Sequence, residues 1–196
     1  MKIEFLETIK VLDGKLLHLH YHQKRYESVL ASYGIEHFNS LSTYIKAPKE
    51  GLFRCRIIYD LHGKIDVSFY PYQKRMINSL KLLEADELCY EKKFAQREVL
   101  DELFEQRERC DDVLIVKNGY ITDTSIANIA LFDGEQWFTP TEPLLRGTTR
   151  QRLIETGFLL LRDISVESLK NYDKMAVMNA MVDFDIIAKK IEEIIC

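Results

Sequence analysis

The chain opens on an alternation of apolar and polar residues, which is the period of a strand that buries one face. The alternation runs over residues 3–11, meets the turn pair Asp13-Gly14 and resumes over 15–17, so it predicts a tight hairpin. Apolar residues then recur at helical spacing over 21–33, and Gly34 follows as a natural end. This segment therefore predicts two strands followed by a helix.

Later segments repeat the contrast between strand and helix patterns. Strands are predicted over 53–60, 65–72, 79–84, 112–116, 120–122, 129–132 and 137–139, and helices over 97–107 and 147–157. Turn pairs such as Asn118-Gly119 separate neighbouring strands, so we expect an α+β protein with mainly antiparallel sheet. The pattern changes character around 73–80, which predicts a small amino-terminal α/β domain over 1–77 and a larger domain over 78–196.

Composition narrows the class of protein. The 196 residues are 46% apolar and 30% charged, which is typical of a soluble globular chain. The net charge is −4 with both signs interleaved, so no nucleic-acid partner is predicted. Glu4 and Glu7 interrupt the start of the chain, and no stretch approaches the ~18 apolar residues of a membrane span. We expect a cytoplasmic protein without a membrane partner.

The cysteines form no closely spaced pair. They are Cys55, Cys89, Cys110 and Cys196. Such spacing favours reduced structural thiols over a zinc site or a disulfide framework. We therefore expect four free thiols.

Two polar segments of the second half are candidates for a ligand site. Thr148 and Thr149 begin a predicted helix, where hydroxyls and backbone N–H groups either bind an anion or simply cap the helix. Asp123, Ser125 and Asn128 crowd a short segment between strands, where such residues commonly close a turn. A buried carboxylate in that segment would need a cationic or N–H partner.

A lysine pair precedes the helix predicted over 97–107. A reactive lysine must lose its proton near neutral pH, which requires burial or a neighbouring positive charge. Apolar residues follow Lys93, and Arg97 lies four positions beyond it as a candidate for that charge. The alternative is that Lys92, Lys93 and Arg97 are solvated surface residues.

Three alternating histidines suggest a different chemistry. His18, His20 and His22 would share one face of a strand and could bind zinc there. A helix that begins by His20 would keep them apart, and no further ligand is evident nearby, so we predict no metal site. Arg25 shares a helix face with His22, either as a functional group or as a solvated residue.

The order of these residues resembles that of the class IV aminotransferases. The motifs are H-x-x-R at 22–25, K-x-x-x-R at 93–97, T-D-x-S-x-x-N at 122–128 and G-T-T-R at 147–150. This family contains the branched-chain and D-amino-acid transaminases and 4-amino-4-deoxychorismate lyase, which use pyridoxal phosphate on the two-domain fold-type IV scaffold. The resemblance covers most of the chain, which would be a short member with a cofactor-binding carboxy-terminal domain and a homodimeric assembly.

The resemblance implies a role for each matching residue. Lys93 would form the Schiff base with pyridoxal 5′-phosphate and would later move a proton at the substrate. The other implied cofactor ligands are Arg25, Thr148 and Thr149 at the phosphate, Ser125 and Asn128 around the ring, and Asp123 at the pyridine nitrogen. A carboxylate at that nitrogen keeps it protonated, so the ring can accept electrons from the substrate.

The chain departs from the family pattern at a residue implied to bind the cofactor and at one implied to bind the substrate. Asp123 stands where members usually have Glu, and Asn179 stands where many have a Thr- or Ser-containing loop. Candidates for a substrate carboxylate are Arg54, Arg56, Arg146 and Asn179.

Four functions remain open at this point. The motifs do not separate a transaminase from a lyase, because the lysine can serve both, and of the two we favour transaminase-like chemistry on a D-amino acid or a branched-chain amino acid. The first alternative is aminodeoxychorismate lyase, which releases 4-aminobenzoate and pyruvate. The others are a non-catalytic ligand-binding protein on the same scaffold and a metalloprotein built on the histidines.

Overall fold

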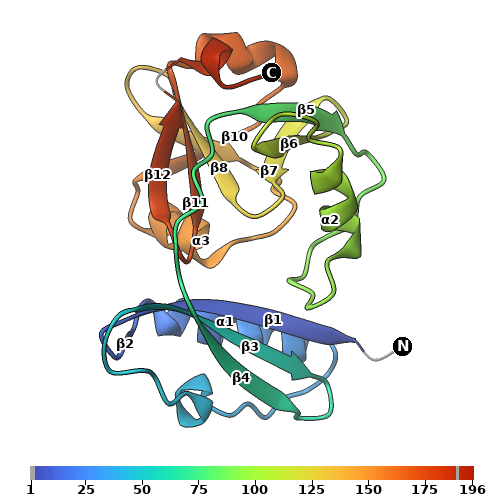
Figure 1. Ribbon diagram of the computed structural model, residues 1–196. Coiled ribbons are helices and arrows are strands. Elements are labelled where there is room, and N and C mark those ends of the chain that lie inside the picture. The colour runs from blue at the N-terminus through green and yellow to red at the C-terminus, as the bar shows by residue number, and fades with distance from the viewer. Residues whose placement is uncertain (1–2, 189) are drawn as a thin grey trace. The chain divides into compact units, whose positions relative to one another are not determined.

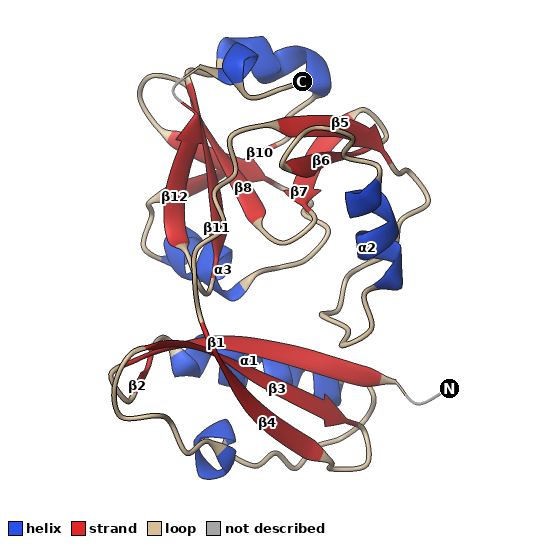
Figure 2. Cartoon of the chain, viewed as in Figure 1, coloured by secondary structure: helices blue, strands red, loops and turns tan. Residues whose placement is uncertain are grey.

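A computed structural model describes residues 3–188 and 190–196. Figure 1 colours the chain from its amino to its carboxy terminus, and Figure 2 distinguishes helices from strands. These residues form two compact units. The first unit is the chain up to Lys74 together with Lys92–Gln96, and the second unit is Arg75–Glu91 together with Arg97–Cys196. The chain therefore leaves the first unit at residue 74 and returns to it once.

The first unit is a four-stranded antiparallel sheet in the order β2-β1-β3-β4, with α1 against one face. Its elements are β1 (Glu4–Leu12), β2 (Lys15–Leu16), α1 (Leu19–Ala31), the short 3₁₀ helix η1 (Leu41–Tyr44), β3 (Leu52–Asp60) and β4 (Ile65–Pro71).

Alternate residues of β1 face α1. Phe5 and Ile9 are fully buried there and pack in one cluster with Tyr26 and Val29 of α1. Glu7 shares this strand phase and is also fully buried. A carboxylate inside an apolar layer must be compensated by cations or N–H donors.

Residues 92–96 run beside the first half of β1. The Leu6 N–H donates to the Lys93 carbonyl oxygen at 2.8 Å, and Phe5 and Phe94 form an antiparallel bridge. The two aromatic rings stack with their centroids 5.6 Å apart. Main-chain pairing therefore fixes Lys93 on the sheet of the first unit.

The second unit is an eight-stranded sheet with the path β10-β9-β8-β7-β6-β5, on which β11 pairs with β8 and β12. The β5/β6 and β9/β10 pairs are parallel and the other pairs are antiparallel. Its elements are β5 (Leu80–Glu84), α2 (Glu98–Glu105), β6 (Asp112–Lys117), β7 (Tyr120–Thr124), β8 (Asn128–Phe132), β9 (Trp137–Pro140), α3 (Thr148–Glu155), β10 (Leu159–Arg162), the 3₁₀ helix η2 (Val166–Asn171), β11 (Lys174–Asn179), β12 (Asp183–Ala188) and the 3₁₀ helix η3 (Ile191–Glu193).

The predicted α+β class with mainly antiparallel sheet is confirmed. Every predicted strand and helix is present, with its ends shifted by no more than two residues. Asp13-Gly14 and Asn118-Gly119 have positive φ at both positions, which is the conformation of the predicted hairpin turns. In the described part of the chain, no helix has the length and apolar character needed to cross a membrane.

The expectation of four free thiols is wrong for two of them. Cys110 and Cys196 form a disulfide across a sequence separation of 86, whereas the buried Cys55 and the exposed Cys89 are free. The Cys196 N–H donates to the Leu80 carbonyl oxygen at 2.9 Å, which lays the end of the chain beside β5. Spacing along the sequence cannot reveal a pair that only tertiary structure brings together.

Candidate functional site

A buried ionic cluster joins β1 to α1 in the first unit. Glu7 Oε1 accepts from Arg25 Nε at 2.7 Å and Glu7 Oε2 accepts from Arg25 Nη2 at 2.6 Å, so the pair is bidentate. His22 Nδ1 lies 2.6 Å from the same Oε2 atom. The side chains of Glu7 and His22 are 1% and 2% exposed, and that of Arg25 is 15% exposed. We call these three residues the Glu7 cluster.

Burial, neighbouring charges and hydrogen bonds together determine which residues of the Glu7 cluster are ionised. Burial raises the pKa of Glu7, but the charge of Arg25 and the bonds from His22 and Arg25 bring it down to about 2. Burial lowers the pKa of His22, as do the charges of Arg25 and Lys93, while Glu7 opposes them. His22 is therefore neutral at neutral pH. Because an ionised carboxylate can only accept, Nδ1 carries the proton and donates to Glu7.

The predicted Schiff-base lysine lies near the Glu7 cluster. Lys93 pairs through its carbonyl with Leu6, the residue before Glu7, and its charge acts on His22. The adjacent Lys92 has different surroundings, with its Nζ 5.2 Å from the centroid of the Tyr33 ring. The first unit thus brings Lys93 into the neighbourhood of the predicted phosphate ligand Arg25.

Two predicted substrate arginines lie elsewhere in the first unit. Along β3, Arg54 and Arg56 alternate with buried residues. Ile57 is one of those buried residues, and it is the β3 residue that pairs with Glu7 of β1. Their side chains therefore project from the sheet face opposite the Glu7 cluster. The guanidinium carbon of Arg54 lies 5.3 Å from the centroid of the Tyr70 ring.

The three histidines do not converge. His22 bonds to Glu7, while the His20 ring lies against Tyr21 with centroids 4.0 Å apart, and α1 already begins at Leu19. Within residues 3–188 and 190–196, no three His, Cys, Asp or Glu side chains are grouped as a metal site. The metalloprotein alternative thus gains no support from the described residues.

Asp123 is a buried carboxylate on β7 in the second unit. Its Oδ1 accepts from Asn128 Nδ2 at 2.8 Å and its Oδ2 accepts from the Leu145 N–H at 2.9 Å. Burial raises the pKa of Asp123 to about 6, although these bonds and the charge of Arg150 act to lower it. A cation placed against this carboxylate would favour its ionised form.

Asn128 connects Asp123 to the loop before α3. Its Nδ2 atom donates both to Asp123 Oδ1 and, at 2.7 Å, to the Leu145 carbonyl oxygen. Gly147 lies directly against this amide, because a Cβ added at Gly147 would be 2.0 Å from Asn128 Oδ1. The backbone of Gly147 has φ −68° and ψ 146°, which any residue can adopt, so the constraint at this position is steric.

We expect Gly147→Ala to lower the free energy of unfolding by about 1–3 kcal/mol, because the new methyl group must displace Asn128 and break its bonds. Urea unfolding measures this loss. In an Asn128→Ala background the same substitution should cost less than about 0.5 kcal/mol, since the clashing amide is gone. An equal cost in both backgrounds would show that the clash is not the cause.

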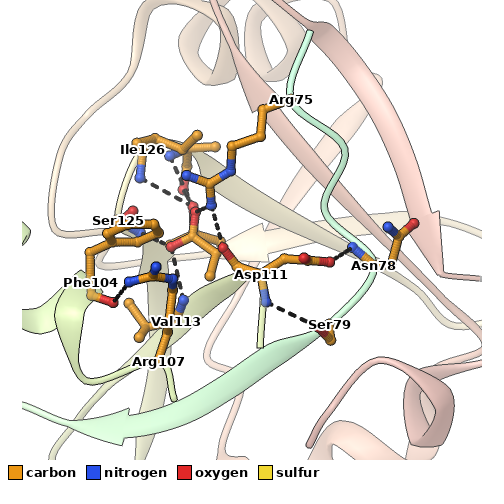
Figure 3. Close-up of polar contacts among 12 residues, drawn as sticks. Arg75, Asn78, Ser79, Phe104, Arg107, Asp111, Val113, Ser125 and Ile126 are labelled. Atoms are coloured by element: carbon orange, nitrogen blue, oxygen red, sulfur yellow. Dashed lines mark hydrogen bonds and ion pairs between the residues drawn. The ribbon is translucent and has the colours of Figure 1, made fainter. Parts of the chain in front are cut away.

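Ser125 is held through its backbone. Its N–H donates to Oδ1 of the buried Asp112 at 3.3 Å, and its carbonyl oxygen accepts from Arg97 Nη2 at 2.9 Å. Asp112 Oδ2 in turn accepts from Arg75 Nη2 at 2.9 Å. Figure 3 shows Arg75 and Ser125 within this group of polar contacts. Arg97, four residues after Lys93, thus supports the loop that carries Ser125.

Thr148 and Thr149 are buried in the first turn of α3, whose start was predicted here, and a helix amino terminus is a place where an anion can bind. The next residue, Arg150, is buried as well. Its Nη2 donates to the Pro140 carbonyl oxygen at 2.7 Å and its Nε donates to Thr139 Oγ1 at 3.3 Å. These bonds tie the start of α3 to the end of β9.

The remaining substrate candidates have local partners. The Arg146 side chain is 72% exposed, and its Nη2 lies 3.4 Å from Glu142 Oε2. Asn179 Oδ1 accepts from two backbone N–H groups of the following turn at 2.9 and 3.1 Å, and its Nδ2 donates to the Ile126 carbonyl oxygen at 3.3 Å. Asn179 therefore closes the β11–β12 turn.

Sequence reasoning missed several residues of this arrangement. Glu7 was assigned no role, although a carboxylate at a buried position of an apolar alternation is a signal for a buried cation. His22 was considered for zinc rather than as a partner of Glu7. Arg150 belongs to the G-T-T-R motif, and its burial could not be read from that motif. Asp112 carried no signal in the sequence.

Comparison with known proteins gives matches over most of the chain. The family model described as "Amino-transferase class IV" matches residues 4–189. A Haemophilus influenzae protein named "Uncharacterized protein" is 35% identical over 182 residues, which cover 89% of this chain and 96% of the relative.

Solved structures match as well. A "putative 4-amino-4-deoxychorismate lyase" from Haemophilus somnus superposes with a TM-score of 0.84 at 34% identity, covering 92% of this chain and 97% of that one. A "hypothetical aminotransferase" from Mycobacterium tuberculosis, in a PLP-bound form, has a TM-score of 0.79 at 18% identity and covers 96% of this chain and 82% of its own. The second match, at this identity, supports the fold alone.

Proposed function

The chain belongs to the class IV aminotransferase family, and on this premise we propose that it binds pyridoxal 5′-phosphate with Lys93 as the covalent anchor. It is an enzyme of this family. The observation that carries the cofactor proposal is Asp123, a buried carboxylate with a pKa of about 6. Such a group is poised to hold a proton at a basic ring nitrogen.

The other groups fit the same cofactor. Arg25 offers a guanidinium of fixed geometry, and Thr148 and Thr149 offer a helix amino terminus, which are the donors that a phosphate requires. We propose that these three residues bind the phosphate. Ser125 and Asn128 would shape the surroundings of the ring, Asn128 by orienting the Asp123 carboxylate.

Lys93 would have a second role once it is released from the cofactor. Bound pyridoxal phosphate supplies an electron sink for the bond that breaks at the substrate. The free amine of Lys93 would then hold and return the proton at the substrate carbon.

For the reaction, we propose cleavage of aminodeoxychorismate to 4-aminobenzoate and pyruvate. The support is the name of the Haemophilus somnus protein, which is 34% identical over nearly its whole length. Transaminase-like chemistry on a D-amino acid or a branched-chain amino acid, which is the expectation from the sequence, is the second candidate. Arg54, Arg56, Arg146 and Asn179 remain proposals for contacts with the substrate carboxylates.

A direct comparison of the two reactions tests this proposal. Protein loaded with pyridoxal phosphate should release pyruvate and 4-aminobenzoate in equal amounts from aminodeoxychorismate, and Lys93→Ala should release neither. Amino exchange between D- or L-amino acids and an oxo acid is measured in parallel. Exchange without pyruvate release would favour the transaminase, and failure to bind the cofactor would refute both reactions.

We also propose that the protein works in the cytoplasm as a homodimer, as the family resemblance implies. Light scattering coupled to size-exclusion chromatography tests the second part. A mass of 46 kDa, twice the 23.0 kDa of one chain, is expected, and a mass of one chain would refute it.

A further inference from the structure

We propose that Glu7 and His22 are positioning residues that hold the Arg25 guanidinium in the orientation that binds the phosphate group of the cofactor. This inference rests on the proposed function, which makes Arg25 a phosphate ligand. It assigns a purpose to two buried polar side chains that the covalent chemistry at Lys93 does not use.

Two hydrogen bonds to Glu7 fix the orientation of the Arg25 guanidinium. Nε and Nη2 of Arg25 each donate to a different oxygen of Glu7, at 2.7 and 2.6 Å. Two parallel bonds from neighbouring nitrogens fix the plane of a guanidinium and therefore the direction of its remaining N–H groups. An arginine without such a partner would sample many rotamers before it met an anion.

His22 in turn fixes the position of the Glu7 carboxylate. Its Nδ1 donates to the Glu7 oxygen that also accepts from Arg25 Nη2. His22 and Arg25 lie three residues apart on α1 and Glu7 lies on β1, so the cluster ties the helix to the strand. With both oxygens bonded and its side chain 1% exposed, Glu7 is held in one position.

The negative charge of Glu7, taken by itself, opposes phosphate binding at Arg25. A carboxylate beside Arg25 repels a phosphate, so a Glu7 that served only to neutralise Arg25 would weaken phosphate binding. The two roles can be separated at constant charge. Glu7→Asp keeps the negative charge but is one methylene shorter, so it cannot keep both bonds to Arg25 and the bond from His22.

The measurement is the ratio of the dissociation constants of pyridoxal and pyridoxal 5′-phosphate, from the absorbance change on binding. This ratio isolates the contribution of the phosphate. We expect Glu7→Asp and Arg25→Lys each to lower it about tenfold or more, and the double variant to lose no more than the stronger single variant. Glu4→Asp, the same change on the same strand at a half-buried carboxylate, should leave the ratio unchanged.

A second pair of variants, at His22, tests the proposal if Glu7→Asp does not fold. His22→Asn keeps an N–H donor for Glu7 and should preserve the ratio, whereas His22→Phe removes the donor and should lower it severalfold. Circular dichroism verifies the fold of each variant.

The outcomes separate this inference from the proposed function. If wild type binds neither compound covalently, or if Arg25→Lys leaves the ratio unchanged, the proposed role of Lys93 or of Arg25 is wrong. If Arg25→Lys lowers the ratio while Glu7→Asp and His22→Phe do not, positioning is refuted and the proposed function stands. Additive losses in the double variant would also refute positioning, because residues that act through one another do not add.

Discussion

Lys93→Ala is expected to abolish the visible absorbance band of protein loaded with pyridoxal phosphate, together with the bleaching of that band by borohydride. The substitution removes the only group proposed to bond the cofactor covalently and to move the proton at the substrate. Turnover should fall by about a thousandfold or more, as is usual when a nucleophile and general base is lost. Absorbance spectra and single-turnover assays measure the two effects.

Lys92→Ala is the matched control for this prediction. The two lysines are adjacent in sequence, but the Lys92 ammonium lies over the Tyr33 ring, whereas Lys93 is paired to β1 and acts on His22. Lys92→Ala should therefore keep the band and most of the activity. A band that survives in Lys93→Ala and vanishes in Lys92→Ala would show that Lys92, and not Lys93, is the covalent anchor.

The strands and helices with a clear period were predictable from the sequence. The alternation of β1 and the positive-φ pairs Asp13-Gly14 and Asn118-Gly119 determine their structures locally. β11 was not predicted because its central residues form an unbroken apolar run that is buried on both faces, which periodicity cannot distinguish from a buried helix. β10 was missed for the opposite reason, since its last three residues are exposed.

The site was predictable only where a motif carries it. Thr148 and Thr149 were recognised because hydroxyls after a glycine mark a helix start. The role of Glu7 depends on the strand phase and on a partner 18 residues later, Arg25. The same limit applies to Gly147, at the start of α3, because the side-chain amide that restricts it belongs to Asn128 on β8. Contacts between residues that are distant in sequence depend on tertiary packing, which local sequence patterns do not determine.

Asp123→Asn should lower turnover about a hundredfold or more, because the amide cannot hold a proton at the ring nitrogen and the electron sink is weakened. Asp123→Glu keeps the acid and introduces the residue that family members usually have, so it should retain more activity than Asp123→Asn. Equal activity of Asp123→Asn and wild type would contradict the proposed role. Steady-state assays of the loaded enzymes decide between these results.

The same substitution makes a prediction for the stability of the cofactor-free protein. The pKa of Asp123 rises from an ordinary 3.8 to about 6 on folding, so between these values the folded state binds more protons than the unfolded state. The contribution of Asp123 to the free energy of unfolding must then fall as pH rises through this window. From about pH 4.5 to about pH 7.5 the loss from this group is about 2 kcal/mol.

Asp123→Asn does not titrate, so the stability of wild type minus that of the variant should fall by this amount over the same range. Glu7 does not obscure the effect, because its pKa is lowered to about 2 and its contribution is lost only as pH falls below its ordinary 4.5. Urea unfolding of both proteins measures the difference. A cation at the ring nitrogen would favour the ionised carboxylate, so loading with pyridoxal phosphate should remove the decline in wild type. A decline that persists in the loaded protein would mean that Asp123 does not meet the cofactor.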